Sequence, residues 1–303
     1  MRAYVGVTDW DWFNLLSSLS GLDEVNFWQP GGNHVFRALS PMELFLFKLH
    51  SPNNFIVGGG FFAHSNLMPI SLAWESFGEK NGVRNITEMR NRVGKYRRVK
   101  QNPVENYTIG CILLEQPFFL PRQSWIPIPS DWSNSIVQGK TYDLSVDPGL
   151  SIWKALKFGL PANELWHENQ RRYGEPTTVL PRLGQGSFRI MVTDAYERRC
   201  AITNERTLPA LDAIHIVPFS ENGENAVNNG LLLRKDLHAL FDKGYITVSP
   251  ALNVEVSGRI KEEFENGRDY YRLQGSIIRS PANLRDRPSP TCLEWHNNHI
   301  FLG

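Results

Sequence analysis

The chain has 303 residues, 41% hydrophobic and 12% aromatic, which is enough for two folded domains and excludes an intrinsically disordered protein. Its formal charge of +1 excludes a surface that is basic throughout, so any nucleic-acid-binding surface must be local. Three cysteines lie far apart with no C-x-x-C pair, and no apolar run approaches about 18 residues or forms a signal-peptide core, so we expect a reduced cytoplasmic protein with no membrane partner and no structural zinc.

Residues 1–145 predict a first domain in which short strands surround a few helices, a mixture typical of an α+β fold or a small barrel. Helical segments are expected to begin at Asp9, Leu72 and Ile86. Strands are expected at Tyr4–Val7, Val35–Leu39, Leu44–Leu49, Asn54–Ala63, Asn106–Glu115 and Ser124–Pro127.

The order of several aromatic segments in this domain resembles an EVE-type domain of the PUA-like superfamily. Those segments are Tyr4 with Trp12-Phe13, Asn26–Gln29, Leu39–Phe47 and Ile56–Gly59. The chain departs from the pattern at Pro41-Met42-Glu43, where EVE-type domains carry Pro-Gly-Asp. The resemblance implies a PUA-like small β-barrel with helices, and an aromatic pocket that accepts a flipped and often modified base.

A flipped base needs flat apolar walls and groups that form hydrogen bonds with its edge. Trp10, Trp12, Phe13, Trp28 and Gln29 are the candidates for this role. Pro-Gly-Gly follows Trp28-Gln29, so we expect these two residues in a loop, where a large aromatic side chain is less easily explained as core. The alternative is that most of the aromatic side chains belong to the core.

The segment Arg84–Lys100 contains seven basic residues and one acid, a formal charge of +6. Such a run is usually a solvated helix face, but in a chain that is otherwise neutral it also fits a strip that contacts phosphates. Residues 182–243 hold eight basic and eight acidic residues, so DNA binding is assigned to the first domain. The candidate contacts are Arg90, Arg92, Lys95, Arg97 and Arg98.

Residues 146–181 are expected to form a helical linker, with helices at Ser151–Phe158 and Asn163–Tyr173. The second domain, residues 182–303, opens with an amphipathic helix over Phe188–Tyr196.

The stretch Leu211–Asp242 carries the residues with the clearest chemistry. His215 lies in an apolar run, Asn229 follows fourteen positions later before Gly-Leu-Leu-Leu, and His238 follows nine positions after that on a short amphipathic segment. This spacing and context resemble the ββα-metal core of HNH endonucleases. The resemblance implies that His215 is the general base, that Asn229 holds the loop between two strands, and that His238 binds one divalent metal, Mg²⁺ or Mn²⁺.

The second metal ligand is less clear from the sequence. Many HNH enzymes carry Asp or His directly before the catalytic His, where this chain has Ile214. Asp212 is two positions before Ile214 and therefore on the same side of a regular strand, which makes it the candidate. Asp236 and Asp242 are the alternatives.

Cys200 is expected to be a buried structural residue. Zinc-stabilised HNH proteins resemble one another in a second Cys three positions after the first, and this chain has Thr203 there.

Together the two resemblances imply a restriction-type endonuclease that recognises a modified base in double-stranded DNA and hydrolyses the phosphodiester bond. Two alternatives remain: an HNH nuclease, specific or not, that acts on unmodified DNA, and a non-catalytic DNA reader with a degenerate HNH core. A homodimer is plausible, because two copies would provide one site for each strand.

Overall fold

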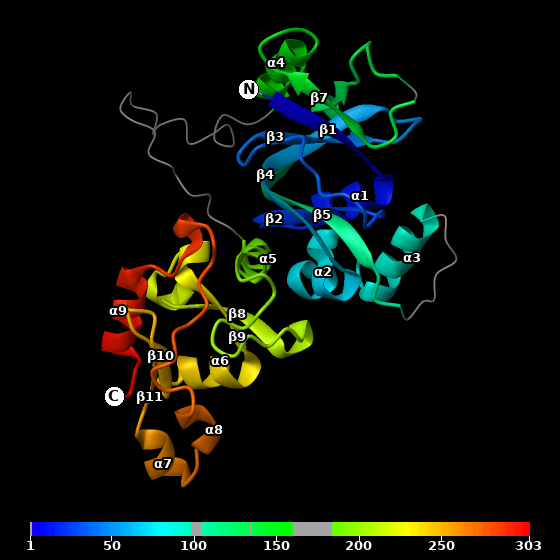
Figure 1. Ribbon diagram of the computed structural model, residues 1–303. Coiled ribbons are helices and arrows are strands. Elements are labelled where there is room, and N and C mark those ends of the chain that lie inside the picture. The colour runs from blue at the N-terminus through cyan, green and yellow to red at the C-terminus, as the bar shows by residue number, and fades with distance from the viewer. Residues whose placement is uncertain (1, 98–104, 134, 160–183) are drawn as a thin grey trace, which may run out of the picture. The chain divides into compact units, whose positions relative to one another are not determined.

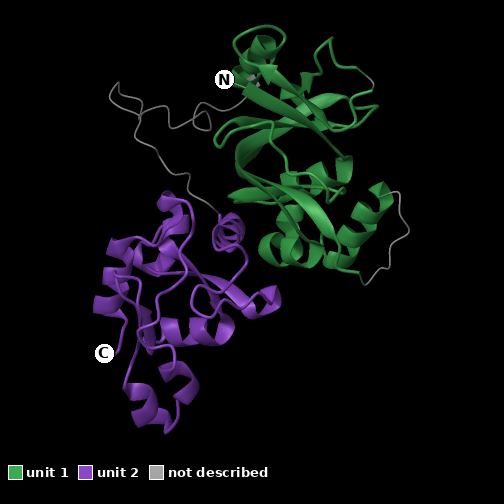
Figure 2. Ribbon diagram, viewed as in Figure 1, with its two compact units in different colours: residues 1–181 green, residues 182–303 purple. Residues whose placement is uncertain are grey.

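A computed structural model describes residues 2–97, 105–133, 135–159 and 184–303. The chain divides into two compact units, residues 1–181 and 182–303 (Figure 2), and each is described by itself. The expected helix at Asn163–Tyr173 and the candidate DNA contact Arg98 lie outside the described residues.

The first unit is built on one sheet with the strand order β2-β5-β4-β3-β1-β7 (Figure 1), and β6 pairs with β4 outside this order. β1 pairs with β3 in parallel, and the other pairs are antiparallel. The strands are β1 (Arg2–Thr8), β2 (Glu24–Gln29), β3 (Leu44–Leu49), β4 (Phe55–Pro69), β5 (Thr108–Phe119), β6 (Ile126–Pro127) and β7 (Gly139–Asp143).

This sheet differs from the closed small barrel that the PUA-like resemblance implies. β2 and β7 lie at the two ends of the strand order, and no pairing between them is present in the described residues. The unit is therefore an α+β structure with an open sheet. The register of β4 against β5 shifts at two places, Gly59/Phe61 and Phe62/His64, which interrupts the regular ladder of this long strand without closing it onto β7.

Helices of the first unit are α1 (Trp10–Ser18), α2 (Ile70–Phe77), α3 (Ile86–Tyr96) and α4 (Gly149–Gly159), with the short 3-10 helices η1 (Gly78–Asn81) and η2 (Arg122–Ser124). Side chains of Asp9 and Asn85 cap α1 and α3 by accepting hydrogen bonds from backbone N–H groups of the first turn. The side chains at these two positions therefore explain why α1 and α3 begin close to the expected starts at Asp9 and Ile86.

Two local expectations for this unit are wrong. Trp28 and Gln29 lie in β2 and not in a loop, because the Pro-Gly-Gly signal acts only after the strand has ended. Val35–Leu39 does not form a strand. There the backbone N–H of Phe36 donates to the side-chain hydroxyl of Ser65 in β4, at 3.0 Å, and not to a backbone carbonyl of that strand.

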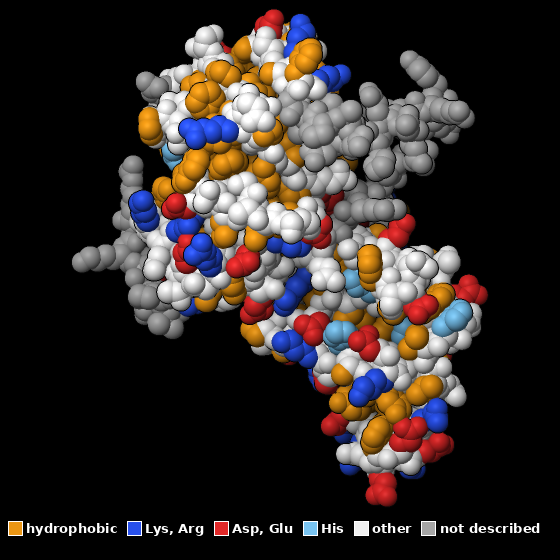
Figure 3. All heavy atoms as spheres, turned by 180° about the vertical axis from the view of Figure 1, so that it is seen from behind, with side chains coloured by type: hydrophobic (Ala, Val, Ile, Leu, Met, Phe, Trp, Pro, Cys, Tyr) orange, Lys and Arg blue, Asp and Glu red, His pale blue; other side chains and the backbone are white. Residues whose placement is uncertain are grey.

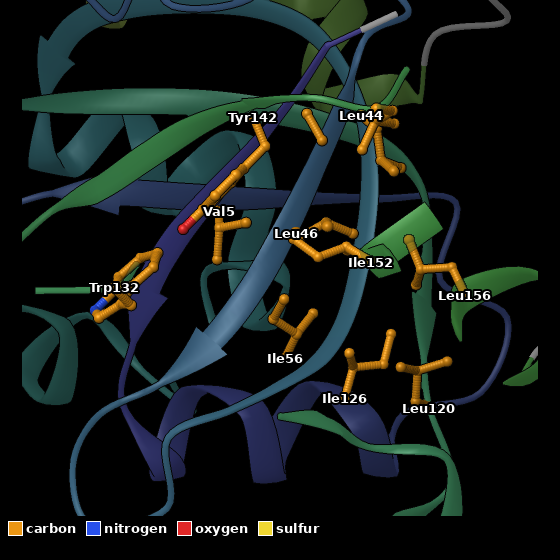
Figure 4. Packing of buried hydrophobic residues seen from close by; sticks show 12 residues of the cluster. Val5, Leu44, Leu46, Ile56, Leu120, Ile126, Trp132, Tyr142, Ile152 and Leu156 are labelled. Carbon is orange, nitrogen blue, oxygen red and sulfur yellow. The ribbon is translucent and has the colours of Figure 1, made fainter. Parts of the chain in front are cut away.

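The core of the first unit lies on both sides of β3, whose six residues are all buried. Leu44 and Leu46 face a cluster that includes Val5, Ile56 and the α4 residues Ile152 and Leu156 (Figure 4). Phe45 and Phe47 alternate with them and therefore point to the opposite face.

On that opposite face, aromatic rings pack against one another, most of them edge to face or tilted. The ring of Phe27 is 4.7 Å from Phe45, and the ring of Trp12 is 5.0 Å from Phe47. A Cβ at Gly82 would lie 2.1 Å from Cδ1 of Trp12, so only glycine allows the indole this place.

The second unit begins with α5 (Gln185–Ala195), followed by the hairpin of β8 (Leu211–His215) and β9 (Gly230–Arg234) and then α6 (Lys235–Asp242). A second hairpin, β10 (Ile246–Val248) and β11 (Val254–Val256), comes next. The remaining helices are α7 (Arg259–Phe264), α8 (Arg268–Tyr271) and α9 (Pro290–His299), with η4 (Leu208–Ala210), η5 (Phe219–Glu221), η6 (Val227–Asn229) and η7 (Leu284–Asp286).

His296 ties the last helix to the centre of the second unit. Its ring nitrogens contact the carbonyl oxygen of Phe241 at 3.1 Å and the hydroxyl of Thr247 at 2.8 Å. Burial lowers its pKa to about 4, so the ring is neutral and serves to join α9, α6 and β10.

Among the described helices, none has both the length and the apolar character needed to cross a membrane.

Two buried carboxyl groups oppose each other at the edge of the first sheet, since Glu24 of β2 pairs with Glu115 of β5. The ammonium of Lys80 lies 3.1 Å from the carboxylate of Glu24. Oε1 of Glu115 has no hydrogen-bond partner in the described structure. Burial, followed by the charges of Glu24 and Asp23, raises the pKa of Glu115 to about 8.

We therefore expect Glu115→Gln to stabilise the protein in alkaline solution. Folded Glu115 keeps its proton until about pH 8, whereas the unfolded chain releases it near its ordinary value of 4.5, so the free energy of unfolding falls as pH rises between these values. Glutamine removes this dependence. Thermal unfolding should show a higher Tm for the variant near pH 8 and a smaller difference near pH 5.

Glu79→Gln, at an exposed position on η1, is the matched control and should follow the wild type at both pH values. An unchanged pH dependence of Tm in Glu115→Gln would contradict the assignment.

Candidate functional site

His215 is the last residue of β8 and is held on two sides. Its ring stacks on Phe188 of α5, with ring centroids 3.9 Å apart and an interplanar angle of 7°. Its Nε2 lies 2.7 Å from the amide oxygen of Asn225. Burial lowers the pKa of His215 below its usual value, and the hydrogen bond with Asn225 acts in the opposite direction. A neutral imidazole in a fixed orientation is suited to accept a proton near pH 7.

Gly230 makes room for this stacking. It pairs with His215 across the hairpin, and a Cβ there would lie 2.5 Å from Val192 and 3.1 Å from Phe188. A side chain at this position would therefore displace the ring on which His215 rests.

Asn229 closes the loop between β8 and β9. Its side-chain oxygen accepts a hydrogen bond from the backbone N–H of Val217 at 2.9 Å, and its amide nitrogen donates to the carbonyl oxygens of Val217 and Glu224, each at 3.0 Å. Its own carbonyl accepts from the backbone N–H of Ile216 at 2.9 Å. Asn229 is buried, and these contacts fix the backbone that directly follows His215.

His238 projects from α6 between two carboxylates. Its Nδ1 is 3.2 Å from Asp212 of β8, and its Nε2 is 3.0 Å from Asp242, one helical turn further along α6. The hydrogen bond with Asp242 raises the pKa of His238, burial opposes this, and Asp212 adds to the increase. The structure thus brings together Asp212 and His238, the two residues that the sequence analysis named as candidate metal ligands.

A divalent cation at His238 would have few protein ligands. No group of three or more His, Cys, Asp and Glu side chains within the described ranges is spaced to hold one ion. Asp212 and His238 would hold it as a pair, and Mg²⁺ commonly keeps several waters and substrate oxygens besides one or two protein ligands. One ring nitrogen of His238 would first have to give up its carboxylate partner.

The remaining alternative, Asp236, is engaged elsewhere. Its carboxylate accepts from Nε of Arg234 at 2.9 Å. It contributes to an ion pair at the start of α6 and does not contact His238.

Most of the aromatic residues assigned to a base pocket belong to the core. Trp12, Phe13 and Trp28 are buried, and the indole N–H of Trp28 donates to the carbonyl of Asn81 at 2.9 Å. Their geometry gives no support to contact with a base. Gln29 ends β2 and is half-buried, whereas Trp10, at the start of α1, is 45% exposed.

The basic strip is only partly available for phosphates. Arg92 pairs with Glu88 at 2.6 Å and with Asp9 at 3.5 Å, which offsets its charge. Arg97 donates to the carbonyls of Pro30 and Thr108. Lys95 is exposed and Arg90 is half-buried.

Two residues of the His215 environment were not found from the sequence. Asn225 lies in a polar segment with three other asparagines between residues 222 and 229, and nothing in its spacing distinguishes it. Phe188 is recognisable as an apolar helix residue, but its contact with His215 depends on how α5 packs on the hairpin. Cys200 is buried, as expected, and its sulfur accepts a hydrogen bond from the backbone N–H of Thr203.

We expect Asn229→Ala to lower the free energy of unfolding by about 2–4 kcal/mol, because it removes three hydrogen bonds of a buried side chain, each worth about 1 kcal/mol. Urea unfolding measures this loss, and amide hydrogen exchange should show reduced protection at Ile216 and Val217. The neighbouring variant Asn228→Ala, whose side chain is half-buried, is the control. Equal stability of the two variants would contradict the role given to Asn229.

A search of curated proteins finds no match for this chain. Among solved structures, the chain is similar to one described as "Modification dependent TagI restriction endonuclease", with 10% identity and a TM-score of 0.28 over 93% of this chain and 77% of that chain. A likeness of that extent carries no argument about fold or substrate. Residues 200–249 match the family model described as HNH endonuclease. This segment contains His215, Asn225, Asn229 and both residues of the His238–Asp242 pair, so the second unit carries an HNH endonuclease domain and the protein is a nuclease.

Proposed function

We propose that this protein is a DNA endonuclease in which His215 is the general base and one divalent metal assists, and that it cuts duplexes carrying a modified base. The observation that carries the catalytic part is the half-buried, uncharged His215 fixed by Phe188 and Asn225 within the segment that matches HNH endonucleases.

In the proposed reaction, His215 removes a proton from a water molecule, the oxygen of that water bonds to phosphorus, and the bond from phosphorus to the leaving oxygen breaks. The leaving oxygen then takes up a proton from solvent. Asn229 keeps the loop after His215 in one conformation, so the ring does not have to be ordered during the reaction. A divalent metal held by Asp212 and His238 would supply a Lewis acid for the phosphate and the leaving oxygen.

His215→Ala is expected to reduce the rate of cleavage by about 10²- to 10⁴-fold, the usual contribution of a general base. His299→Ala, at an exposed position on α9, should leave the rate unchanged. Chelation of divalent ions should stop cleavage by the wild type. The rate should rise with pH through a pKa below 6.5, because burial favours the neutral ring that acts as base.

The measurement is the initial rate of cleavage of duplex DNA in Mg²⁺ or Mn²⁺ between about pH 5 and pH 8. Wild-type rates in His215→Ala would contradict the assignment of the base. An absence of cleavage by the wild type under all conditions would instead favour a non-catalytic reader.

The proposed reader function of the first unit has its best support at Trp10. Its ring centroid lies 6.1 Å from Trp125, and the two rings meet at 68°. The guanidinium of Arg122 lies 5.8 Å from the centre of the Trp125 ring, and among the described residues Arg122 forms no ion pair. In this proposal the exposed indole of Trp10 stacks on an unpaired base, and Arg122, at the neighbouring Trp125, contacts its phosphate.

Figure 3 shows hydrophobic side chains gathered on part of the visible face of the first unit, which also carries acidic and basic side chains. Cleavage of both strands would be simplest for a homodimer.

A panel of duplexes that contain plain, methylated or hydroxymethylated cytosine tests the reader. We expect a modified duplex to be cut and the plain duplex to be spared, and Trp10→Ala to slow cleavage of the modified duplex at low DNA concentration by about tenfold, since a stacked base is worth about 1–3 kcal/mol. Phe158→Ala removes an aromatic ring that is 93% exposed on α4 and should have no effect. Equal cutting of all duplexes would exclude modification dependence.

A further inference from the structure

The contact between His215 and Asn225 determines which ring nitrogen can act. The side-chain oxygen of Asn225 lies 2.7 Å from Nε2 of His215. An amide oxygen can only accept a hydrogen bond, so Nε2 must carry the proton in this contact. The lone pair of the neutral ring is then on Nδ1.

Asn225 is itself held in place from both sides by Asn229. The preceding residue, Glu224, accepts a hydrogen bond from the side chain of Asn229 at 3.0 Å. The following residue, Ala226, accepts one from the backbone N–H of Asn229 at 2.9 Å. The backbone on both sides of Asn225 is therefore held by Asn229, and this fixes the distance from the Asn225 side chain to His215.

The imidazole therefore has little rotational freedom. Phe188 covers one face of the ring and Asn225 fixes its Nε2 edge. Stacking alone would allow the ring to flip by 180° about the Cβ–Cγ bond, because both orientations present a flat face to Phe188. The hydrogen bond to Asn225 distinguishes the two orientations, because only one places Nε2 at the amide oxygen.

We propose that Asn225 is a positioning residue for hydrolysis, which selects the Nε2-protonated tautomer of His215 and thereby makes Nδ1 the nitrogen that accepts the proton of the attacking water. This inference rests on the proposed nuclease function. After the transfer both ring nitrogens carry protons, and the amide oxygen of Asn225 stabilises the resulting imidazolium through the same hydrogen bond.

The polar group that acts on the pKa of His215 is the neutral side chain of Asn225 and not a charged residue. Charged groups on the adjoining elements are Arg189 and Asp194 of α5, Asp212 of β8, Arg234 of β9, and Glu221 and Glu224 near the loop. The influences on the pKa of His215 are burial, which lowers it, and Asn225, which raises it. Removal of the amide should therefore lower the pKa of His215, and a carboxylate in its place should raise it.

The test compares Asn225→Ala and Asn225→Asp with Asn228→Ala in the full-length protein. We expect Asn225→Ala to reduce kcat by about 10- to 100-fold, as for other residues that orient a catalytic histidine, while the acidic limb of the pH–rate profile moves to lower pH. Asn225→Asp should retain more activity and move that limb to higher pH. Asn228→Ala should match the wild type in both respects.

Nitrogen NMR of the His215 ring provides a second readout that requires no DNA. The wild type should show a neutral ring protonated at Nε2, and Asn225→Ala should show a mixture of tautomers. A wild-type kcat and pH profile in Asn225→Ala, or an Nδ1-protonated ring in the wild type, would overturn the inference. If the wild type cuts no DNA, the proposed function fails, and the NMR result still decides the tautomer.

Discussion

The side-chain amide of Asn229 carries three hydrogen bonds that hold together the two ends of the loop between β8 and β9. Without them, the backbone groups of Val217 and Glu224 would lose these partners, and each such hydrogen bond contributes about 0.5–1.5 kcal/mol to stability. The position of His215 and the segment that carries Asn225 both depend on this closure. One buried amide therefore supports the proposed general base and the residue proposed to orient it.

The contact between His238 and Asp212 arises in a different way from the one between His215 and Asn225. His238 and Asp212 meet because β8 pairs with β9 and α6 follows β9 directly, which brings the first turn and middle of α6 next to β8. The two histidines also differ in electrostatics. Burial favours the neutral form of His215, whereas the carboxylates of Asp242 and Asp212 favour the charged form of His238. Opposite environments of this kind separate the roles of two residues with the same side chain.

Much of the HNH segment can be predicted from the sequence, because its determinants are local. Alternation along β8 places Asp212 on the side of Ile214, and the contact with His238 agrees with that placement. The first unit is harder to predict. A closed barrel is not found in the described residues, because strand order depends on long-range pairing that local patterns do not contain. The turn residues after Gln29 mark where β2 ends, and they do not show that Trp28 precedes that end.

Contacts between side chains of distant segments are the least accessible to sequence reasoning. Trp12 is an aromatic candidate in the sequence, and only the packing of Phe27, Phe47 and Gly82 around it identifies it as core. Asn225 is one of several similar asparagines until the loop is closed, when its amide oxygen reaches His215.

Gly230 directly follows Asn229 in the sequence, and this Asn-Gly step also bears on the chemical ageing of the protein. Asn-Gly sequences deamidate when the glycine nitrogen attacks the asparagine side chain and ammonia leaves. At this site the side-chain nitrogen is bound to two carbonyl oxygens, and Gly230 is fixed in the ladder opposite His215. The hydrogen bonds that order the loop thus also oppose the attack geometry, and the folded state protects the residue on which the loop depends. In the second Asn-Gly pair of this loop the side chain of Asn222 is exposed, and there the backbone N–H of the buried Gly223, which donates to the carbonyl oxygen of Pro218 at 3.0 Å, is the group held in place.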